Sequence, residues 1–141
     1  MVTVRSLTLA LTPTLTLAVM LSGCSAMPHH QCLRGEEPRI SDVLYFGTRK
    51  HDGLVSPSEW DAFLRRSVTP RFEQGFTVWA ASGQWRGADG ERVREPSYVL
   101  SVVHADDERR EAAVREIMSE YKSLFQQEAV LRVRSHVCVS L

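Results

Sequence analysis

The sequence of 141 residues has no excess of either charge, since 17 lysines and arginines balance 17 aspartates and glutamates. Arg5 is the only charged residue among residues 1–23, so without that segment the balance is 16 (17 minus Arg5) against 17. Nucleic acids and anionic membrane surfaces attract proteins through clustered excess positive charge. The composition therefore argues against a nucleic-acid partner and against polybasic attraction to a membrane.

The motifs of several common enzyme classes are also missing. There is no Gly-x-Ser-x-Gly elbow, no phosphate loop ending in Gly-Lys-Ser/Thr, no His-Glu-x-x-His and no Cys-x-x-Cys. The basic aromatic motif of RNA-recognition modules is absent as well. We therefore expect no cofactor and assign no catalytic residue, and we favour a binding protein over an enzyme.

Long apolar runs are scarce, and residues 7–21 form the one extended uncharged stretch. As a helix these residues would span roughly 22 Å, which is short of the roughly 30 Å hydrocarbon core of a membrane. Pro13 would bend or break such a helix. Because Arg5 precedes the stretch, residues 1–23 have the layout of a secretory signal peptide rather than a permanent membrane span.

The string Leu-Ser-Gly-Cys at residues 21–24 resembles the lipobox of bacterial lipoproteins. The resemblance implies diacylglycerol on the Cys24 sulfur, cleavage before Cys24 and acylation of the new amino terminus. Two or more acyl chains give stable membrane anchoring, whereas one gives reversible binding. Ser25 follows, which favours an outer membrane facing the periplasm if the cell has two membranes. An ordinary secretory signal with a chance cysteine is the alternative.

Residues 24–38 are polar and predict a tether, and residues 39–141 have the size of a single domain. Short β-branched and aromatic runs predict strands, while apolar residues at three- and four-residue steps predict helices. Ser56 and Glu59 form a capping box with Pro57 at the first helical position. The predicted elements are a strand at 40–47, a helix at 57–68, strands at 76–85 and 92–104, a helix from about 107 to 125, and a strand at 129–139.

This order is the split βαβ, or ferredoxin-like βαββαβ, pattern of an α+β domain. Right-handed crossovers then place both helices on one face of a four-stranded antiparallel sheet. The first and last strands become antiparallel neighbours. The last strand has the alternation of a half-exposed strand, with Leu131, Val133 and Ser135 against Arg132, Arg134 and His136.

Several segments of the domain carry a resemblance to a known family, namely residues 45–47, 69–72, 82–90, 130–133 and 138–140. At these segments the chain resembles a bacterial lipoprotein family, domain-of-unknown-function family 3574. The Gly-Gln-Trp-Arg-Gly string with Asp-Gly nearby is the most specific part, and the likeness covers roughly residues 43–141. It implies export and domain identity, but it transfers no catalytic residue because the family has no assigned activity.

If Cys24 carries lipid, Cys32 and Cys138 remain as an even pair in an exported protein. Cys32 precedes the first strand and Cys138 lies near the end of the last, so antiparallel pairing of these strands brings them to one edge. A disulfide is one interpretation. Because His30 and His136 each lie two residues before one of these cysteines, a Cys₂His₂ zinc site is the second. Free thiols are the third.

Four residues cluster at the predicted tip of the central hairpin, namely Gln84, Trp85, Arg86 and Asp89. An arginine beside a tryptophan and a carboxylate can grip an anionic or aromatic ligand, whose identity the sequence leaves unknown. In the structural alternative, Trp85 covers the end of the core while Arg86 pairs with Asp89 or Glu95.

Two helices on one face leave the other face of the sheet uncovered. If Val78 points toward the helices, Trp79 points away, joined by Val99 or Val103 from the neighbouring strand. An apolar open face marks an interaction site, and a second copy of the chain is its simplest partner. A shift of one residue would exchange the two faces.

His104 ends the third predicted strand and could act as a general base near neutral pH. No nucleophile and no orienting partner can be assigned to it from the sequence. We therefore interpret His104 as a structural histidine.

Overall fold

The computed structural model describes residues 32–140. The expected signal peptide, the lipobox with Cys24, and His30 lie outside the described residues. No helix within residues 32–140 has both the length and the apolar character needed to cross a membrane.

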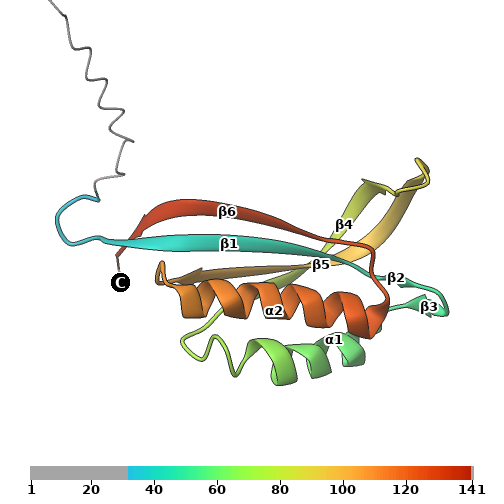
Figure 1. Ribbon diagram of the computed structural model, residues 1–141, viewed down its shortest axis with the longest axis horizontal. Coiled ribbons are helices and arrows are strands. Elements are labelled where there is room, and N and C mark those ends of the chain that lie inside the picture. Colours follow the sequence, from blue (N-terminus) through green and yellow to red (C-terminus); the bar gives the residue numbers. More distant parts are fainter. Residues whose placement is uncertain (1–31, 141) are drawn as a thin grey trace, which may run out of the picture.

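A four-stranded antiparallel sheet has both helices on one of its faces (Figure 1). Its strand order is β4-β5-β1-β6, which is the ferredoxin-like order, so the predicted fold is confirmed. The first and last strands are neighbours, as predicted. The strands are β1 (Glu37–Gly47), β4 (Thr77–Arg86), β5 (Arg92–His104) and β6 (Val130–Val139); the helices are α1 (Pro57–Phe63), continued by a π-helical turn at Leu64–Val68, and α2 (Glu108–Phe125).

The start of α1 follows from its sequence. The Ser56 hydroxyl accepts a hydrogen bond from the Glu59 N–H, and the Glu59 carboxylate accepts one from the Ser56 N–H at 2.8 Å. A hydrogen bond from Lys50 to Glu59, assisted by the Ser56 bonds, lowers the pKa of Glu59 to about 2. Between β1 and α1 the chain forms a short hairpin with two residues in each strand, β2 (Arg49–Lys50) and β3 (Gly53–Leu54), which the predicted elements do not include.

The core lies between the sheet and the helices. Phe46 of β1, Phe63 of α1 and Tyr121 of α2 are fully buried, and Tyr121 packs edge-on against Phe46 with ring centroids 4.6 Å apart. Trp60 stacks on Tyr98 of β5 at 4.5 Å. Edge-on and stacked pairs add to the stabilisation that burial of these rings provides. Within residues 32–140, the core cluster draws most of its residues from β1, α1, β5, α2 and the start of β6.

β6 places Leu131 and Val133 on the face away from the helices, whereas Val130 at its start belongs to the core. Leu131 and Val133 are 55% and 48% exposed, whereas the side chain of Arg132 between them is only 16% exposed. The predicted alternation is present, but the side covered by α2 is the arginine side. An ion-pair network explains this orientation.

The network is centred on Asp42 of β1, which is fully buried. Arg132 donates to both carboxylate oxygens of Asp42 at 2.7 Å and also to both oxygens of Glu111 on α2. The hydrogen bonds that Arg132 donates lower the pKa of Glu111 to about 2, and the acceptance of these bonds by Glu111 and Asp42 raises the pKa of Arg132. Arg134 joins from the same face, with Asp106 and Glu111 as partners.

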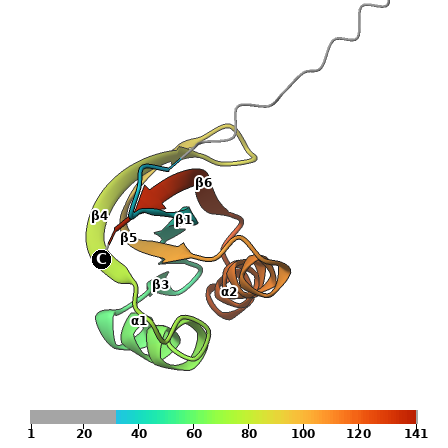
Figure 2. The same cartoon turned by 90° about the vertical axis from the view of Figure 1, so that its left-hand side faces the viewer.

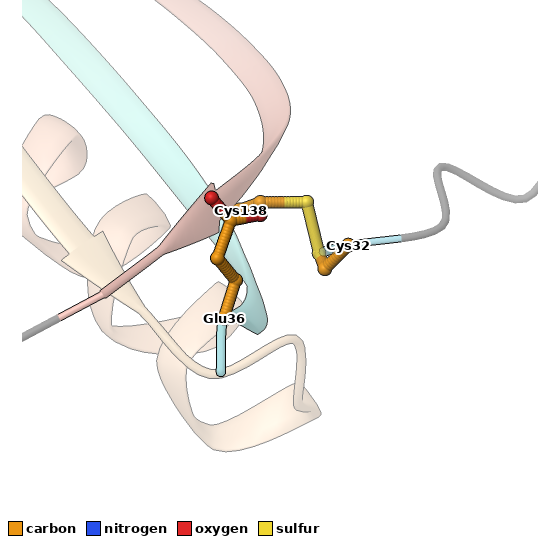
Figure 3. A group of neighbouring side chains, drawn as sticks. All are labelled: Cys32, Glu36 and Cys138. Carbon is orange, nitrogen blue, oxygen red and sulfur yellow. A yellow bond between two sulfur atoms is a disulfide. The ribbon is translucent and has the colours of Figure 1, made fainter. Parts of the chain in front are cut away.

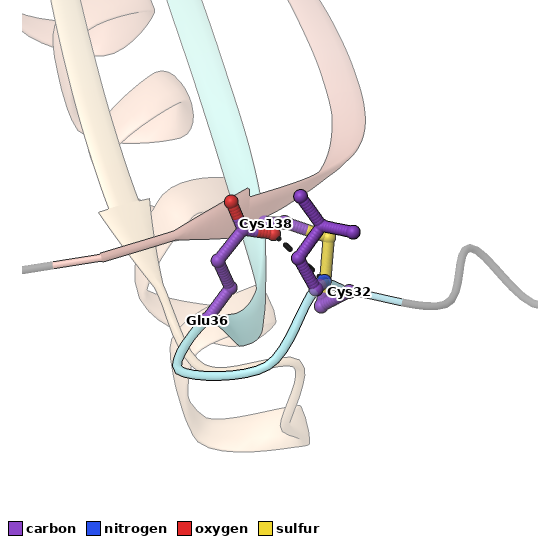
Figure 4. Close-up of a disulfide and its surroundings, with 4 residues drawn as sticks. Cys32, Glu36 and Cys138 are labelled. Atoms are coloured by element: carbon purple, nitrogen blue, oxygen red, sulfur yellow. Dashed lines mark hydrogen bonds between the residues drawn. A yellow bond between two sulfur atoms is a disulfide. The ribbon is translucent and has the colours of Figure 1, made fainter.

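A disulfide joins Cys32 to Cys138, with Cα atoms 5.4 Å apart (Figure 3). Cys138 lies opposite Pro38 in the β1–β6 ladder, so the pairing of the first and last strands brings the cysteines together, as predicted. Glu36 lies beside the bond and accepts a hydrogen bond from the Leu33 N–H at 3.0 Å (Figure 4). The zinc interpretation requires two thiolates, and the sulfur–sulfur bond removes both.

Candidate ligand cavity

A cavity of about 570 Å³ lies on the sheet face opposite the helices. One wall is the inner side of the β4–β5 hairpin, the floor is the end of β1, and the other wall is the connection from α2 to β6. Small-molecule sites in proteins have volumes of about 300–1,000 Å³ and mostly apolar walls with a few polar groups. The cavity has this size and this kind of lining.

The hairpin forms a wall because it extends past its neighbour. The β1–β5 pairing ends at Gly47 opposite Ser97, whereas the β4–β5 pairing continues to Arg86 opposite Arg92. The free part of the hairpin bends away from the helices and arches over the open face (Figures 1 and 2). At its tip, Gly90 adopts a φ of +85°, a conformation that favours glycine. The tip reaches across the cavity, where the Ala88 N–H donates to a Glu128 oxygen at 3.2 Å.

The floor depends on the absence of a side chain at Gly47. A Cβ atom at this position would lie 2.8 Å from a Glu95 oxygen and 2.9 Å from a Gln127 oxygen, both closer than real contacts allow. The Glu95 carboxylate is fixed there by the N–H groups of Thr48 and Arg49, at 3.1 and 2.6 Å. Gly47 thus lets β1, the hairpin and the loop after α2 converge.

Three of the four hairpin residues singled out from the sequence line the cavity, namely Gln84, Trp85 and Asp89. Trp85 is 46% exposed and is not part of the core cluster, so the interpretation that it covers the core is wrong. Arg86 is exposed and is not a lining residue. Within residues 32–140 it has no carboxylate within 4.0 Å, so the expected pairing with Asp89 or Glu95 is absent.

The open face carries a cross-strand row of apolar residues. Trp79 lies opposite Val99, Val99 opposite Tyr45, and Tyr45 opposite Leu131. Phe76 and Val78 pack against the core, so Trp79 points away from the helices.

The residues of this face differ in exposure. Trp79 is 45% exposed and Val103 46%, whereas Val99 is only 1% exposed. Val99 therefore adds little to any surface that a partner would touch. Tyr45 and Leu131 belong both to the apolar row and to the cavity lining, so the two features are continuous.

His104 lies on the other face, beside the helices. Its Nε2 atom is 2.9 Å from the Asp42 carboxylate and its Nδ1 atom is 2.7 Å from the Ala105 carbonyl oxygen. Its side chain is 3% exposed. The orienting partner that the sequence did not identify is Asp42, which is 62 residues away in the chain. With both ring nitrogens engaged, the geometry favours the structural interpretation of His104.

The sheet order and the two helices on one face define a ferredoxin-like α+β domain. A family model described as a protein of unknown function (DUF3574) matches residues 41–141, and the chain belongs to this family. A search of curated proteins found no match.

Two solved structures are similar to the chain in fold. One is a phage SAM lyase in complex with S-methyl-5'-thioadenosine, at 17% identity and a TM-score of 0.55, covering 79% of this chain and 94% of that one. The other is a phage SAM lyase in the apo state, at 16% identity and a TM-score of 0.54, with the same coverage. At such identities the likeness is one of fold.

Proposed function

We propose that the domain binds a small molecule in the cavity beneath the β4–β5 hairpin. The cavity itself carries the proposal, because its volume of about 570 Å³ suits a small organic ligand. Trp85 and Tyr45 line it and are 46% and 40% exposed, so their rings are available for contact. The proposed role is binding, and no reaction is assigned to the cavity.

The fold likeness suggests which ligands to test first. One of the similar phage structures holds S-methyl-5'-thioadenosine, a purine nucleoside thioether. A flat purine ring can stack on an aromatic side chain, and Trp85 offers an exposed one. Purine nucleosides therefore come first in a screen, followed by a general fragment library.

The test is ligand-observed NMR and thermal unfolding of residues 25–141, exported so that the disulfide forms. We expect a ligand to bind with Trp85-dependent affinity, and Trp85→Ala to weaken it about tenfold or more, since stacking contributes ~1–3 kcal/mol per base. Trp79→Ala is the matched control, because Trp79 lies on the same face outside the cavity lining. A ligand whose affinity is unchanged in Trp85→Ala, or a screen in which no compound binds, would contradict the proposal.

We further propose that the open face pairs with a second copy of the chain. Trp79 and Val103 are half exposed on this face, which also carries the exposed Val133 and Leu131 of β6. An apolar surface of this kind is typical of an interaction site. Trp79→Glu should shift the protein to monomers in sedimentation velocity. Dimers that persist in the Trp79→Glu variant would refute pairing through Trp79.

We propose that lipid on Cys24 anchors the protein in a bacterial envelope, at the outer membrane and facing the periplasm if the cell has two membranes. Cys32 lies eight positions after Cys24, which allows a reach of at most about 28 Å. The disulfide lies at the start of β1 and the cavity at its end, so the cavity opens far from the anchored end of the domain. Cys24→Ser should abolish palmitate labelling and move the protein from the detergent to the aqueous phase. Continued labelling would refute lipidation at Cys24.

A further inference from the structure

The lining of the cavity is acidic. It contains three carboxylates, Asp89, Glu95 and Glu128, against one basic side chain, Arg49. Within the described part of the chain, none of the three carboxylates has a basic group within 4.0 Å. The Arg49 guanidinium is directed to the Arg94 carbonyl oxygen at 3.3 Å.

Backbone hydrogen bonds hold each of these carboxylates in place. Asp89 accepts from the Glu91 N–H at 2.9 Å, Glu95 from two N–H groups of the chain after β1, and Glu128 from the Ala88 N–H. In each case only one oxygen is used, and the second oxygen has no hydrogen-bond partner among residues 32–140. The carboxylates are thus positioned without being neutralised.

Two of the carboxylates lie close to each other around Gly87. A Cβ atom placed on Gly87 would be 2.8 Å from an Asp89 oxygen and 3.9 Å from a Glu128 oxygen. Two negative charges at one end of a cavity disfavour one another, and a cation beside them relieves the repulsion. The absence of a side chain at Gly87 lets the Asp89 carboxylate pack against the backbone there, on the side where Glu128 also lies.

The same cavity presents aromatic and apolar surface. Trp85 and Tyr45 line it with Val93 and Leu131, and the faces of aromatic rings attract cations as well as flat rings. Resting on the proposed binding role, we infer that the ligand is a small organic cation with a flat ring. The ring contacts the aromatic and apolar wall, and the positive charge lies near Asp89 and Glu128.

The test compares three indoles that share one ring and differ in charge: tryptamine, a cation; tryptophol, a neutral alcohol; and indole-3-acetate, an anion. Each is titrated into residues 25–141 at neutral pH and low salt, with affinity measured by NMR. We expect tryptamine to bind at least about tenfold more tightly than tryptophol, and indole-3-acetate to bind least.

The variant Asp89→Asn/Glu128→Gln should reduce the preference for tryptamine over tryptophol to less than about threefold. Both amides keep the acceptor oxygen that holds the backbone bond. Glu91→Gln is the matched control, because it removes one charge from the same hairpin tip at a residue that does not line the cavity.

The outcomes separate the two proposals. Equal binding of tryptamine and tryptophol, or tighter binding of indole-3-acetate, would overturn the inferred positive charge of the ligand. In that case, loss of binding in Trp85→Ala would still support the cavity as the binding site. A preference for tryptamine that the double variant leaves unchanged would overturn the assignment to Asp89 and Glu128. Failure of all three indoles and of the wider library would overturn the binding role itself.

Discussion

Asp42 is a charged residue at a position where strand β1 otherwise contributes apolar side chains to the covered face. Its neighbours two residues away, Ile40 and Leu44, are fully buried hydrophobic residues. Arg132 and His104 both contact its carboxylate, and no buried side-chain polar atom in the described residues lacks a hydrogen-bond partner. A buried charge is tolerated only when it is paired in this way.

Arg132→Met should therefore destabilise the domain strongly. The substitution removes two hydrogen bonds from the buried Asp42 carboxylate, and breaking a buried ion pair costs about 3–5 kcal/mol. Arg134→Met is the control on the same strand face, because Arg134 is 36% exposed and its ion pairs contribute about 1 kcal/mol or less. Urea unfolding measures the loss of stability in both variants. Equal, small effects would mean that the network does not hold the sheet to α2.

Glu111 predicts how stability depends on pH. Its pKa is lowered from 4.5 to about 2, chiefly by the hydrogen bonds from Arg132. A carboxyl group whose pKa is lowered by folding stabilises the native state fully above its unfolded-state pKa, and this stabilisation is lost as the pH falls toward the folded-state pKa. The free energy of unfolding should decline between pH 4.5 and 2. Glu111→Gln should be less stable at pH 6 but decline less steeply. If the free energy of unfolding falls equally steeply with pH in the wild type and in Glu111→Gln, the prediction is contradicted.

At the scale of elements, β6 is the strand whose sequence misleads. Apolar residues that alternate with arginines ordinarily face a core, yet Leu131 and Val133 are half exposed. Alternation along a strand predicts two different faces, but it does not say which face is covered. Which face of β6 is covered depends on Asp42 of β1 and Glu111 of α2, because both pair with Arg132.

Val133→Thr tests the orientation of β6 with a change that keeps the side-chain shape. Val133 is 48% exposed, so its substitution should cost about 0.5 kcal/mol or less. Val102→Thr places the same hydroxyl at a position that is 1% exposed and should cost about 1–3 kcal/mol. Equal costs would mean that the open face is covered in solution. The measurement is the free energy of unfolding at low protein concentration.

At the scale of the whole molecule, the disulfide and the cavity lie at opposite ends of the sheet. The bond joins residues separated by 106 positions and fixes the segment before β1 to the end of β6. A crosslink over so long a loop restricts the unfolded chain, and loss of a native disulfide typically costs 2–5 kcal/mol.

Reduction should therefore lower the free energy of unfolding of the exported domain by about 2–5 kcal/mol. Intact-mass analysis should show a gain of about 2 Da on reduction, because two thiols replace the bond. Cys32→Ser/Cys138→Ser should reproduce the loss of stability without any response to reductant. No mass gain in the exported protein would contradict the disulfide.

Much of the fold follows from the sequence because its determinants are local. The capping box at Ser56 starts α1, and the Gly90 turn closes the hairpin. Hydrophobic periods place the main strands and α2 close to their observed bounds. The order of these elements is compatible with few topologies, and strand pairing within the predicted one brings Cys32 to Cys138.

The candidate site was predicted only in part. The hairpin tip was singled out because its residues lie close together in the sequence, and Gln84, Trp85 and Asp89 do line the cavity. Arg86 does not, because the direction of a side chain on a bent hairpin depends on the bend. Glu95 and Glu128 come from other segments of the chain, and no local pattern links them to the tip.

The sequence by itself determined the elements, their order and the chemistry at the hairpin tip, since all three depend on residues near one another in the chain. The tertiary structure alone decided which face of β6 is covered, that Asp42 orients His104, and that three carboxylates share one cavity with Trp85. These features depend on charges and rings that folding brings together from distant segments. Their energies are those of burial and pairing, which exist only once the sheet has formed.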